Sequence, residues 1–327
     1  MKAMGYMRRL LLCVAAAWAA AAPVLAADAW PARPVRIIVP FPAGGGVDFV
    51  ARLVAQKLSE KTGQSFVVEN RAGASGVIGA DAVAKSAADG YTVLIASPAE
   101  VLVGAIAGQR TPYDTRRDLT PVTLAGETPL VIAVHPAVPA ASMEALLASA
   151  KQDEQLSYGT PGNGSTMHFA GESLNLAAAT SILHVPYKGA APAVADLLGN
   201  QIPMGIVGMP PIVPHYRSGK LKVLAVTSPK RSSAMPDVPA MAELPGFADY
   251  RFTNWMGVYV PAGTPQPVVE QLAADIGSVV REPDTRKRLQ EQGVEPVGST
   301  PAEFAAFLQS ERERYERIAR QRNIRIE

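Results

Sequence analysis

Cysteine is nearly absent from this sequence of 327 residues, since its single cysteine, Cys13, lies among the first 26 residues. A chain with one cysteine forms no internal disulfide, and removal of those residues also excludes thiolate chemistry. Aromatic residues make up 6% and charged residues 18% of the chain, against 48% hydrophobic residues. This balance excludes disorder, collagen and coiled coil, and indicates a globular protein.

An excess of charge is also missing. Lysine and arginine number 31, against 29 aspartate and glutamate. Three of the positive residues, Lys2, Arg8 and Arg9, lie in the first nine positions, and without them the balance turns slightly negative. Binding to a phosphate backbone needs a concentrated positive surface, so we expect no nucleic-acid partner.

One long uncharged run is present, Leu10 to Ala26, and it follows those positive residues. Val24, Leu25 and Ala26 place small residues at positions −3 and −1 of a cleavage site. Residues 1–26 therefore have the three-part pattern of a cleavable signal peptide, and we expect export to the periplasm. The alternative is a membrane anchor, but the run is short, rich in alanine and interrupted by Pro23.

The remaining chain alternates short apolar runs with helical patterns, which predicts an α/β fold with doubly wound parallel sheets. Its length favours two lobes. Asp48, Thr264 and Thr300 are predicted to begin helices, and residues 228–246 are predicted to form a surface connection. The predicted strands are Val35–Val39, Ser65–Glu69, Tyr91–Ala96, Leu130–Val134, Leu156–Tyr158, Ile182–Val185, Met204–Val207, Leu221–Thr227 and Met256–Val260.

Three glycine-rich loops each follow a predicted strand and precede a predicted helix: Ala43–Gly46, Gly73–Gly76 and Gly159–Ser165. The first amides of a helix have no partner inside it, and the helix dipole adds partial positive charge. Such a junction can hold a carboxylate or phosphate without an arginine. The alternative is that these glycines only make tight turns.

Motifs for catalysis and cofactors are missing. The sequence has no complete nucleotide-binding glycine motif, no nucleophile elbow and no metal-ligand spacing among its four histidines, so we expect no cofactor, no metal and no catalytic residue. Four side chains could still contribute to a ligand site, and each also has a purely structural interpretation. Phe41 could form a pocket wall or belong to the core, and Asp48 could bind an amine or cap its helix. His168 could contact a ligand or simply pack in the interior, and Lys188 could pair with an anion or lie free on the surface. The full candidate set is Phe41, Ala43, Gly44, Gly45, Asp48, Gly73, Ser75, Ser97, Thr160, Gly164, Ser165, His168, Tyr187 and Lys188.

Several segments resemble the Bug-type solute-binding proteins of tripartite tricarboxylate transporters, in order along nearly the whole mature chain. The longest is WPARPVRIIVPFPAGGGVD, residues 30–48. The others are VENRAGASG at 68–76, YGTPGNGS at 158–165, VPYKGAAPA at 185–193, LAVTS at 224–228, PDVP at 236–239 and WMGVYVPAGTP at 255–265.

The resemblance implies a periplasmic-binding-protein fold of type II, with two doubly wound lobes joined by a hinge of two crossing strands. It further implies that the three glycine loops hold carboxylates, with Phe41 at the pocket floor and ordered water bridging ligand and backbone. The sequence departs from the family at Val47 and at Pro98-Ala99-Glu100. These departures concern the ligand rather than the fold.

We place the crossings near Ala125–Thr128 and Thr253–Trp255. The first lobe is then residues 27–125 plus 254–327, and the second is residues 126–253. Two crossings make a hinge, and small molecules commonly bind between lobes.

The leading hypothesis is a monomeric, non-enzymatic periplasmic receptor. It would close on a small organic acid and deliver it to the integral membrane subunits of a transporter. One alternative is an exported hydrolase or isomerase on an α/β scaffold. Another is a ligand-sensing partner of a membrane kinase, which the sequence does not separate from transport.

Overall fold

A computed structural model describes residues 30–152 and 156–324. The chain divides into a short unit, residues 1–32, and a long unit, residues 33–327, which carries every helix and strand named below. The predicted signal peptide lies outside the described residues. None of the helices in the described ranges combines the length and hydropathy needed to cross a membrane.

The first sheet begins with three parallel strands. β1 (Val35–Val39) pairs with β2 (Phe66–Asn70) and with β3 (Thr92–Ala96). The other strands run antiparallel: β9 (Thr253–Pro261) lies between β3 and β4 (Leu119–Val134), and the short β10 (Glu295–Pro296) pairs with β4. In this first sheet the prediction of a parallel arrangement is thus confirmed for β1–β3 but not for β4, β9 and β10, so the sheet is mixed.

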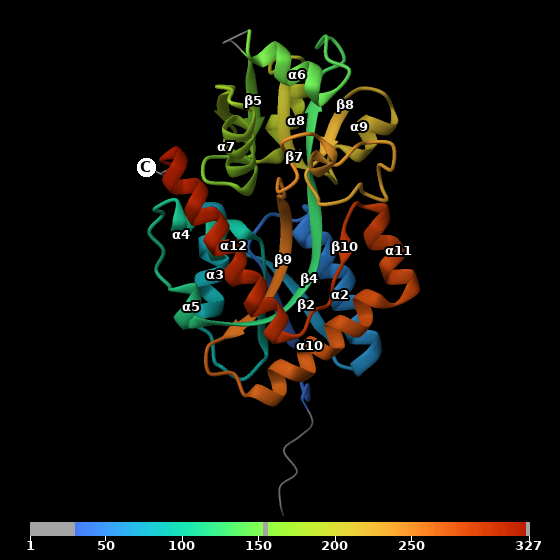
Figure 1. The fold of residues 1–327 in the computed structure, drawn as a ribbon. Coiled ribbons are helices and arrows are strands. Elements are labelled where there is room, and N and C mark those ends of the chain that lie inside the picture. Colours follow the sequence, from blue (N-terminus) through green and yellow to red (C-terminus); the bar gives the residue numbers. More distant parts are fainter. Residues whose placement is uncertain (1–29, 153–155, 325–327) are drawn as a thin grey trace, which may run out of the picture. The chain divides into compact units, whose positions relative to one another are not determined.

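The far half of β4 belongs to the second sheet. Residues Leu130–Val134 pair with β7 (Met204–Gly208), and residues 131–134 with β8 (Lys222–Val226). β7 pairs in parallel with β5 (Ser157–Thr160), which pairs in parallel with β6 (Leu183–Pro186). In Figure 1 β4 passes beside β9 and then continues beside β7. The predicted crossings fall in β4 and β9, where Glu127 faces Trp255.

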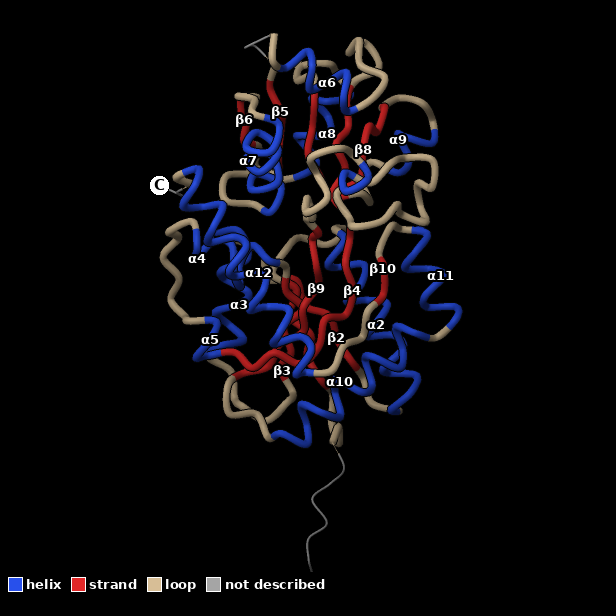
Figure 2. Tube along the Cα trace, viewed as in Figure 1, coloured by secondary structure: helices blue, strands red, loops and turns tan. Residues whose placement is uncertain are grey.

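Helices pack on both sides of these strands (Figure 2). α2 packs against α10, while α12 packs on β4 and against α7. The helix bounds are α2 Gly46–Thr62, α3 Val77–Ala84, α4 Gly104–Ile106, α5 Thr115–Asp118, α6 Met143–Ala150, α7 Thr166–Ala178, α8 Ala190–Leu198, α9 Val213–Arg217, α10 Gln266–Arg281, α11 Pro283–Glu291 and α12 Pro301–Arg322, with short turns η1 Ala74–Gly76, η2 Ala99–Val103 and η3 Met241–Glu243.

Buried aromatic side chains pack α12 against β9 and α7. The ring of Trp255 lies 6.0 Å from Phe304 of α12, edge to face, and Phe169 of α7 meets Tyr315 at 5.2 Å in the same way. All four are fully buried. Burial of each such ring contributes about 1.5–3 kcal/mol, so α12 is fixed by its apolar face rather than by its many charges.

Of three predicted helix starts, two need correction. Asp48 does not cap α2, because the helix already begins at Gly46 after Gly45. Pro265 rather than Thr264 precedes α10, and the Thr264 hydroxyl donates to the Pro261 carbonyl instead. The capping box at Thr300 and Glu303 is confirmed.

One longer-range expectation also fails. The connection 228–246 is not only a surface loop, because Met235 and Met241 are completely buried in it. Their apolar side chains pack into the core, so this segment lies against the rest of the protein.

Candidate functional site

All three glycine loops lie at the carboxyl ends of strands, as predicted. The first follows β1, the second follows β2, and the third follows β5. β1 and β2 are parallel neighbours, so their ends meet at one edge of the sheet. Ligands of α/β sheets bind at such edges.

The first loop exposes Ala43, Gly44 and Gly45 before α2. Gly44 has a φ of +89°, whereas Gly45 is extended with a φ of −80°. The positive φ of this loop thus falls at Gly44 and not at Gly45. A Cβ atom on Gly45 would come no closer than 3.8 Å to its nearest neighbour, the Pro42 carbonyl oxygen, so the position has room for a side chain.

Asp48 anchors this loop from inside the first turn of α2. Its carboxylate is buried and accepts bonds from Gly44 N at 2.9 Å, Arg52 Nε at 2.9 Å and Asn70 Nδ2 at 2.8 Å. Burial alone would raise the pKa of Asp48, but the bonds from Arg52, Gly44 and Asn70 outweigh it, and the pKa is lowered. The carboxylate thus stays ionised and holds the loop.

Asn70, the last residue of β2, ties the strand that leads to the second loop to the segment around the first. Its Nδ2 also donates to the carbonyl oxygen of Phe41 at 3.0 Å, while its Oδ1 accepts from Arg52. Phe41 itself is half-buried between two prolines. Asn70 was not among the sequence candidates, because its role depends on partners 18 to 29 positions away.

The second loop has an unusual backbone. Gly73, Ala74, Ser75 and Gly76 have φ values of 138°, 47°, 53° and 95°. Positive φ in a residue with a side chain costs about 1–3 kcal/mol and is concentrated at functional sites. Ala74 and Ser75 are exposed, so this strained backbone is presented to the outside.

Ser97 follows β3 and is buried with both of its donors engaged. Its amide donates to Glu100 Oε1 at 2.7 Å, and its hydroxyl donates to Glu100 Oε2 at 2.6 Å. Glu100 was not a sequence candidate, although the S-x-x-E spacing of a capping box is visible at Ser97–Glu100. The hydroxyl of Ser97 is therefore already bonded to Glu100.

The third loop ends at Ser165, which caps α7. The Ser165 hydroxyl accepts from the His168 amide at 3.2 Å and donates to the Gly162 carbonyl at 2.7 Å. Thr160, at the end of β5, is completely buried, and Gly164 has a φ of +65°. The hydroxyl of Ser165 is thus used by the loop and the helix.

A stacked pair of imidazoles supports this loop. The rings of His168 and His184 lie 3.9 Å apart with planes 11° from parallel. His168 Nδ1 accepts from the Gly164 amide at 3.1 Å, and His184 Nε2 lies 2.7 Å from Thr160 Oγ1. Burial lowers the pKa of both, that of His184 to about 3 with His168 as a second cause, so both rings are neutral near pH 7. Sequence reasoning missed His184, because only the pairing of β5 with β6 brings it here.

Tyr187 and Lys188 follow β6 beside the third loop. The Tyr187 hydroxyl donates to Asp196 Oδ2 at 2.8 Å, and its amide donates to Thr160 O at 2.9 Å. Burial, with a smaller contribution from Asp196, raises the pKa of Tyr187 to about 12. Lys188 is exposed, and no carboxylate of the described residues forms an ion pair with it.

Residues 208–210, which start at the last residue of β7, lie between the first and third loops. A Cβ atom on Gly46 would lie 3.9 Å from Pro210 Cγ, and one on Gly208 would lie 3.9 Å from Cε of Met167 in α7. The amino ends of α2 and α7 therefore approach the same short segment. The sequence candidates did not include it, since it carries neither a charge nor a glycine-rich pattern.

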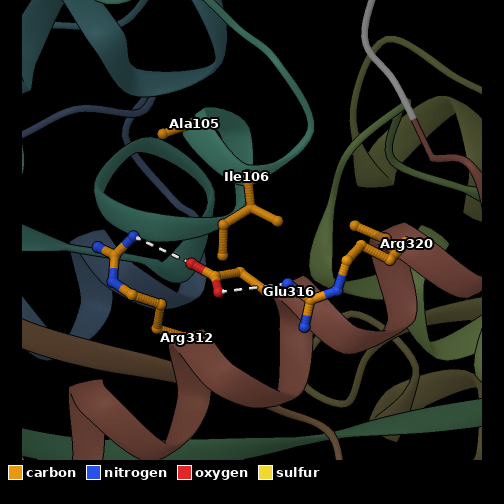
Figure 3. A pocket seen from close by; sticks show the side chains of 6 residues that line it. Ala105, Ile106, Arg312, Glu316 and Arg320 are labelled. Atoms are coloured by element: carbon orange, nitrogen blue, oxygen red, sulfur yellow. Dashed lines mark ion pairs between the residues drawn. The ribbon is translucent and has the colours of Figure 1, made fainter.

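Two hollows of the described surface lie away from these loops. Figure 3 shows one of about 270 Å³ between α4 and α12, where Glu316 Oε1 and Oε2 each lie 4.0 Å from an arginine, Arg312 or Arg320. The other, of about 420 Å³, lies beside α6. Neither is lined by residues of the three glycine loops. Over residues 30–152 and 156–324, no cluster of His, Cys, Asp or Glu could hold a metal ion.

Known proteins are similar to this chain in sequence and fold. Residues 50–324 match the family described as tripartite tricarboxylate transporter family receptor. The chain belongs to this family. Protein BugT of Bordetella pertussis is 40% identical over 308 residues, which cover 94% of each chain.

Two solved structures are also similar. Rpa4515 of R. palustris, solved with adipate, superposes with a TM-score of 0.84 at 35% identity and covers 90% of this chain and 99% of its own. The periplasmic binding protein BugD superposes with a TM-score of 0.79 at 30% identity over 90% and 99%. The periplasmic-binding-protein fold class and the family resemblance are therefore confirmed, and the chain is a solute receptor of this family.

Proposed function

We propose that this receptor is exported, binds a small organic acid through backbone donors of the three glycine loops, and delivers it to integral membrane subunits of a tripartite transporter. The observation that carries the proposal is the joining of loops from the ends of β1, β2 and β5. Asn70 ties the strand that leads to the second loop to the segment around the first, and residues 208–210 lie between the first and the third.

The caps of the helices support an anion at the first two loops. α6, α7 and α12 are capped by serine or threonine hydroxyls, from Ser142, Ser165 and Thr300. α2 and α3, which follow the first two glycine loops, have glycine caps with no side-chain bond. α8, α10 and α11 also lack a side-chain cap, but none of them follows one of the three loops. The first amides of such helices need an acceptor, and a ligand carboxylate supplies one.

The side chains support binding without catalysis. Two hydroxyls lie beside a possible base: Thr160 Oγ1 is 2.7 Å from His184 Nε2, and Ser97 Oγ is 2.6 Å from Glu100 Oε2. Both hydroxyls are buried, and the low pKa of His184, caused by burial, makes it a weak base. Because neither hydroxyl is open to a substrate, we propose that the protein is not an enzyme.

The similar proteins support the ligand class and the compartment. Rpa4515 is described with adipate, a dicarboxylate, and BugD as a periplasmic binding protein. For this chain we infer a carboxylate ligand in the periplasm, reached with the signal peptide of residues 1–26. We keep the two lobes, 27–125 plus 254–327 and 126–253, as the bodies that close on it, and a monomer as the working form.

A thermal-shift screen tests the ligand class. The mature protein is heated with mono-, di- and tricarboxylates, aromatic acids and nicotinate-type compounds, with matched uncharged amides as controls. A ligand at a hundred times its dissociation constant stabilises the folded protein by about 2.7 kcal/mol. We expect at least one carboxylate to raise the melting temperature and its amide to have no effect. Stabilisation by amides alone would reject the carboxylate assignment.

A further inference from the structure

Glu100 is a buried carboxyl group without a basic partner. It is 2% exposed, and its two oxygens accept from the amide and the hydroxyl of Ser97. Within the described ranges, no lysine, arginine or histidine forms an ion pair with it. A carboxylate removed from water without a cation is unstable, so the neutral acid is favoured.

The same side chain lies against the second glycine loop. A Cβ atom on Gly76 would lie 3.0 Å from Glu100 Cβ and 3.1 Å from its carboxyl carbon. Gly76 caps α3 and completes the turn of four positive φ values. An anion held by this turn would therefore have the Glu100 carboxyl group behind the backbone that binds it. Two negative charges so placed repel each other strongly in a buried setting.

We propose that Glu100 is a positioning residue that must be protonated when a carboxylate binds at Gly73–Gly76, so that the receptor takes up a proton together with its ligand. This inference rests on the proposed function. The protonated acid keeps both contacts with Ser97, since one oxygen still accepts the amide and the other donates to the hydroxyl. The protonated state thus holds the loop in the same place without the repelling charge.

Among the titratable groups around Glu100, Glu100 is the group with a pKa near neutral pH. The Tyr113 hydroxyl donates to the backbone carbonyl of Glu100 at 2.6 Å, and Tyr259 of β9 lies nearby. Burial raises the pKa of both tyrosines, with Glu100 as a second cause. Asp81 of α3 adds to the shift of Tyr113, and Arg312 of α12 opposes that of Tyr259. Burial also raises the pKa of Glu100 to about 7, against the bonds from Ser97.

The test is calorimetric titration with sodium adipate, sodium malate and the best carboxylate of the screen, at pH 6 and pH 8. Cationic buffers with different heats of ionisation report the protons taken up. If only the protonated form binds, the dissociation constant rises about tenfold from pH 6 to pH 8. About half a proton should be taken up at pH 7. In Glu100→Gln we expect less than a twofold change with pH and no proton uptake.

Two further variants complete the design. Glu69→Gln removes a carboxylate next to the same loop that is paired with Arg36 and Arg71, and it should keep the tenfold pH dependence. Ser97→Ala removes a bond that favours the charged form of Glu100. It should move the midpoint of the pH dependence upward, and it preserves the test if the Glu100 variant does not fold.

Each remaining result has one meaning. Equal binding at pH 6 and pH 8, or a pH dependence that survives Glu100→Gln, overturns the coupling and leaves the proposed function intact. A lost dependence in Glu69→Gln overturns the assignment to Glu100. If no carboxylate binds the wild type or any of the three variants at any pH, the proposed function fails, and the coupling fails with it.

Discussion

The first and third glycine loops are held in the same way by different chemistry. In each, the third residue of the following helix accepts the amide of the glycine four positions before it: Asp48 from Gly44, and His168 from Gly164. One acceptor is an ionised carboxylate fixed by Arg52, and the other is a neutral imidazole stacked on His184. The geometry of a loop thus depends on an acceptor in the first helical turn, while its response to acid depends on which acceptor is used.

Removal of the first acceptor should have the largest effect on stability. Asp48→Ala leaves the Gly44 amide, the Asn70 amide group and Arg52 without their carboxylate. Bonds to a charged group contribute about 1.5–3 kcal/mol, so we expect a loss of about 2 kcal/mol in urea unfolding. Arg320→Ala, which breaks an exposed pair with Glu316, is the control and should cost less than 1 kcal/mol. Equal losses in the two variants would refute the anchoring role of Asp48.

Acid should weaken the third loop before the first. Because the folded-state pKa values of His168 and His184 are lowered by burial, the unfolded chain binds more protons once the pH falls below about 6.5. Stability should therefore fall from pH 6.5 towards pH 3, by at least about 1.4 kcal/mol, which is the free energy of one pKa unit. His184→Gln should flatten this slope in urea unfolding, whereas His135→Gln, at an exposed turn, should not. An unchanged slope in His184→Gln would show that the stack is not the sensitive element.

Substitution of two neighbouring glycines in the first loop should affect ligand binding differently. Gly44→Val forces a side chain into a φ of +89°, whereas Gly45 is extended and has room for one. We expect Gly44→Val to weaken binding of the best carboxylate more than tenfold, about 1.4 kcal/mol, and to lower stability. Gly45→Val should keep its stability and lose binding only if the ligand reaches the backbone there.

Lys188→Ala is the matched test of a direct ion pair in the same titrations. We expect a smaller loss than for Gly44→Val, because backbone donors carry the anion in our proposal. Abolished binding in Lys188→Ala with normal binding in Gly44→Val would replace backbone recognition by an ion pair.

The cap of α7 should give the smallest effect. Ser165→Ala removes the hydroxyl that accepts the His168 amide, at about 0.5–2 kcal/mol in thermal unfolding. Ser142→Ala removes the matching cap of α6, far from the glycine loops. Both variants should lower stability to a similar extent, but only Ser165→Ala should also weaken ligand binding. Equal binding by the two variants would limit Ser165 to a capping role.

Much of the local structure was predictable from the sequence. β1 occupies the predicted residues Val35–Val39, the three glycine loops follow strands, and Thr300 caps α12. These features depend on residues within about four positions of each other, through alternation, glycine and capping side chains. The same short range explains why the S-x-x-E pattern at Ser97–Glu100 is visible in the sequence, whereas the residues that surround Glu100 in the fold could not be predicted from it.

The sequence by itself determined where the chain turns and where backbone donors are left open, because those properties are set between near neighbours. The tertiary structure decided which groups support the donors: Asn70 against Phe41, His184 against His168, and Gly76 against Glu100. The members of these pairs lie 16 to 29 positions apart, so strand pairing and core packing had to bring them together before burial could shift a pKa or fix a loop.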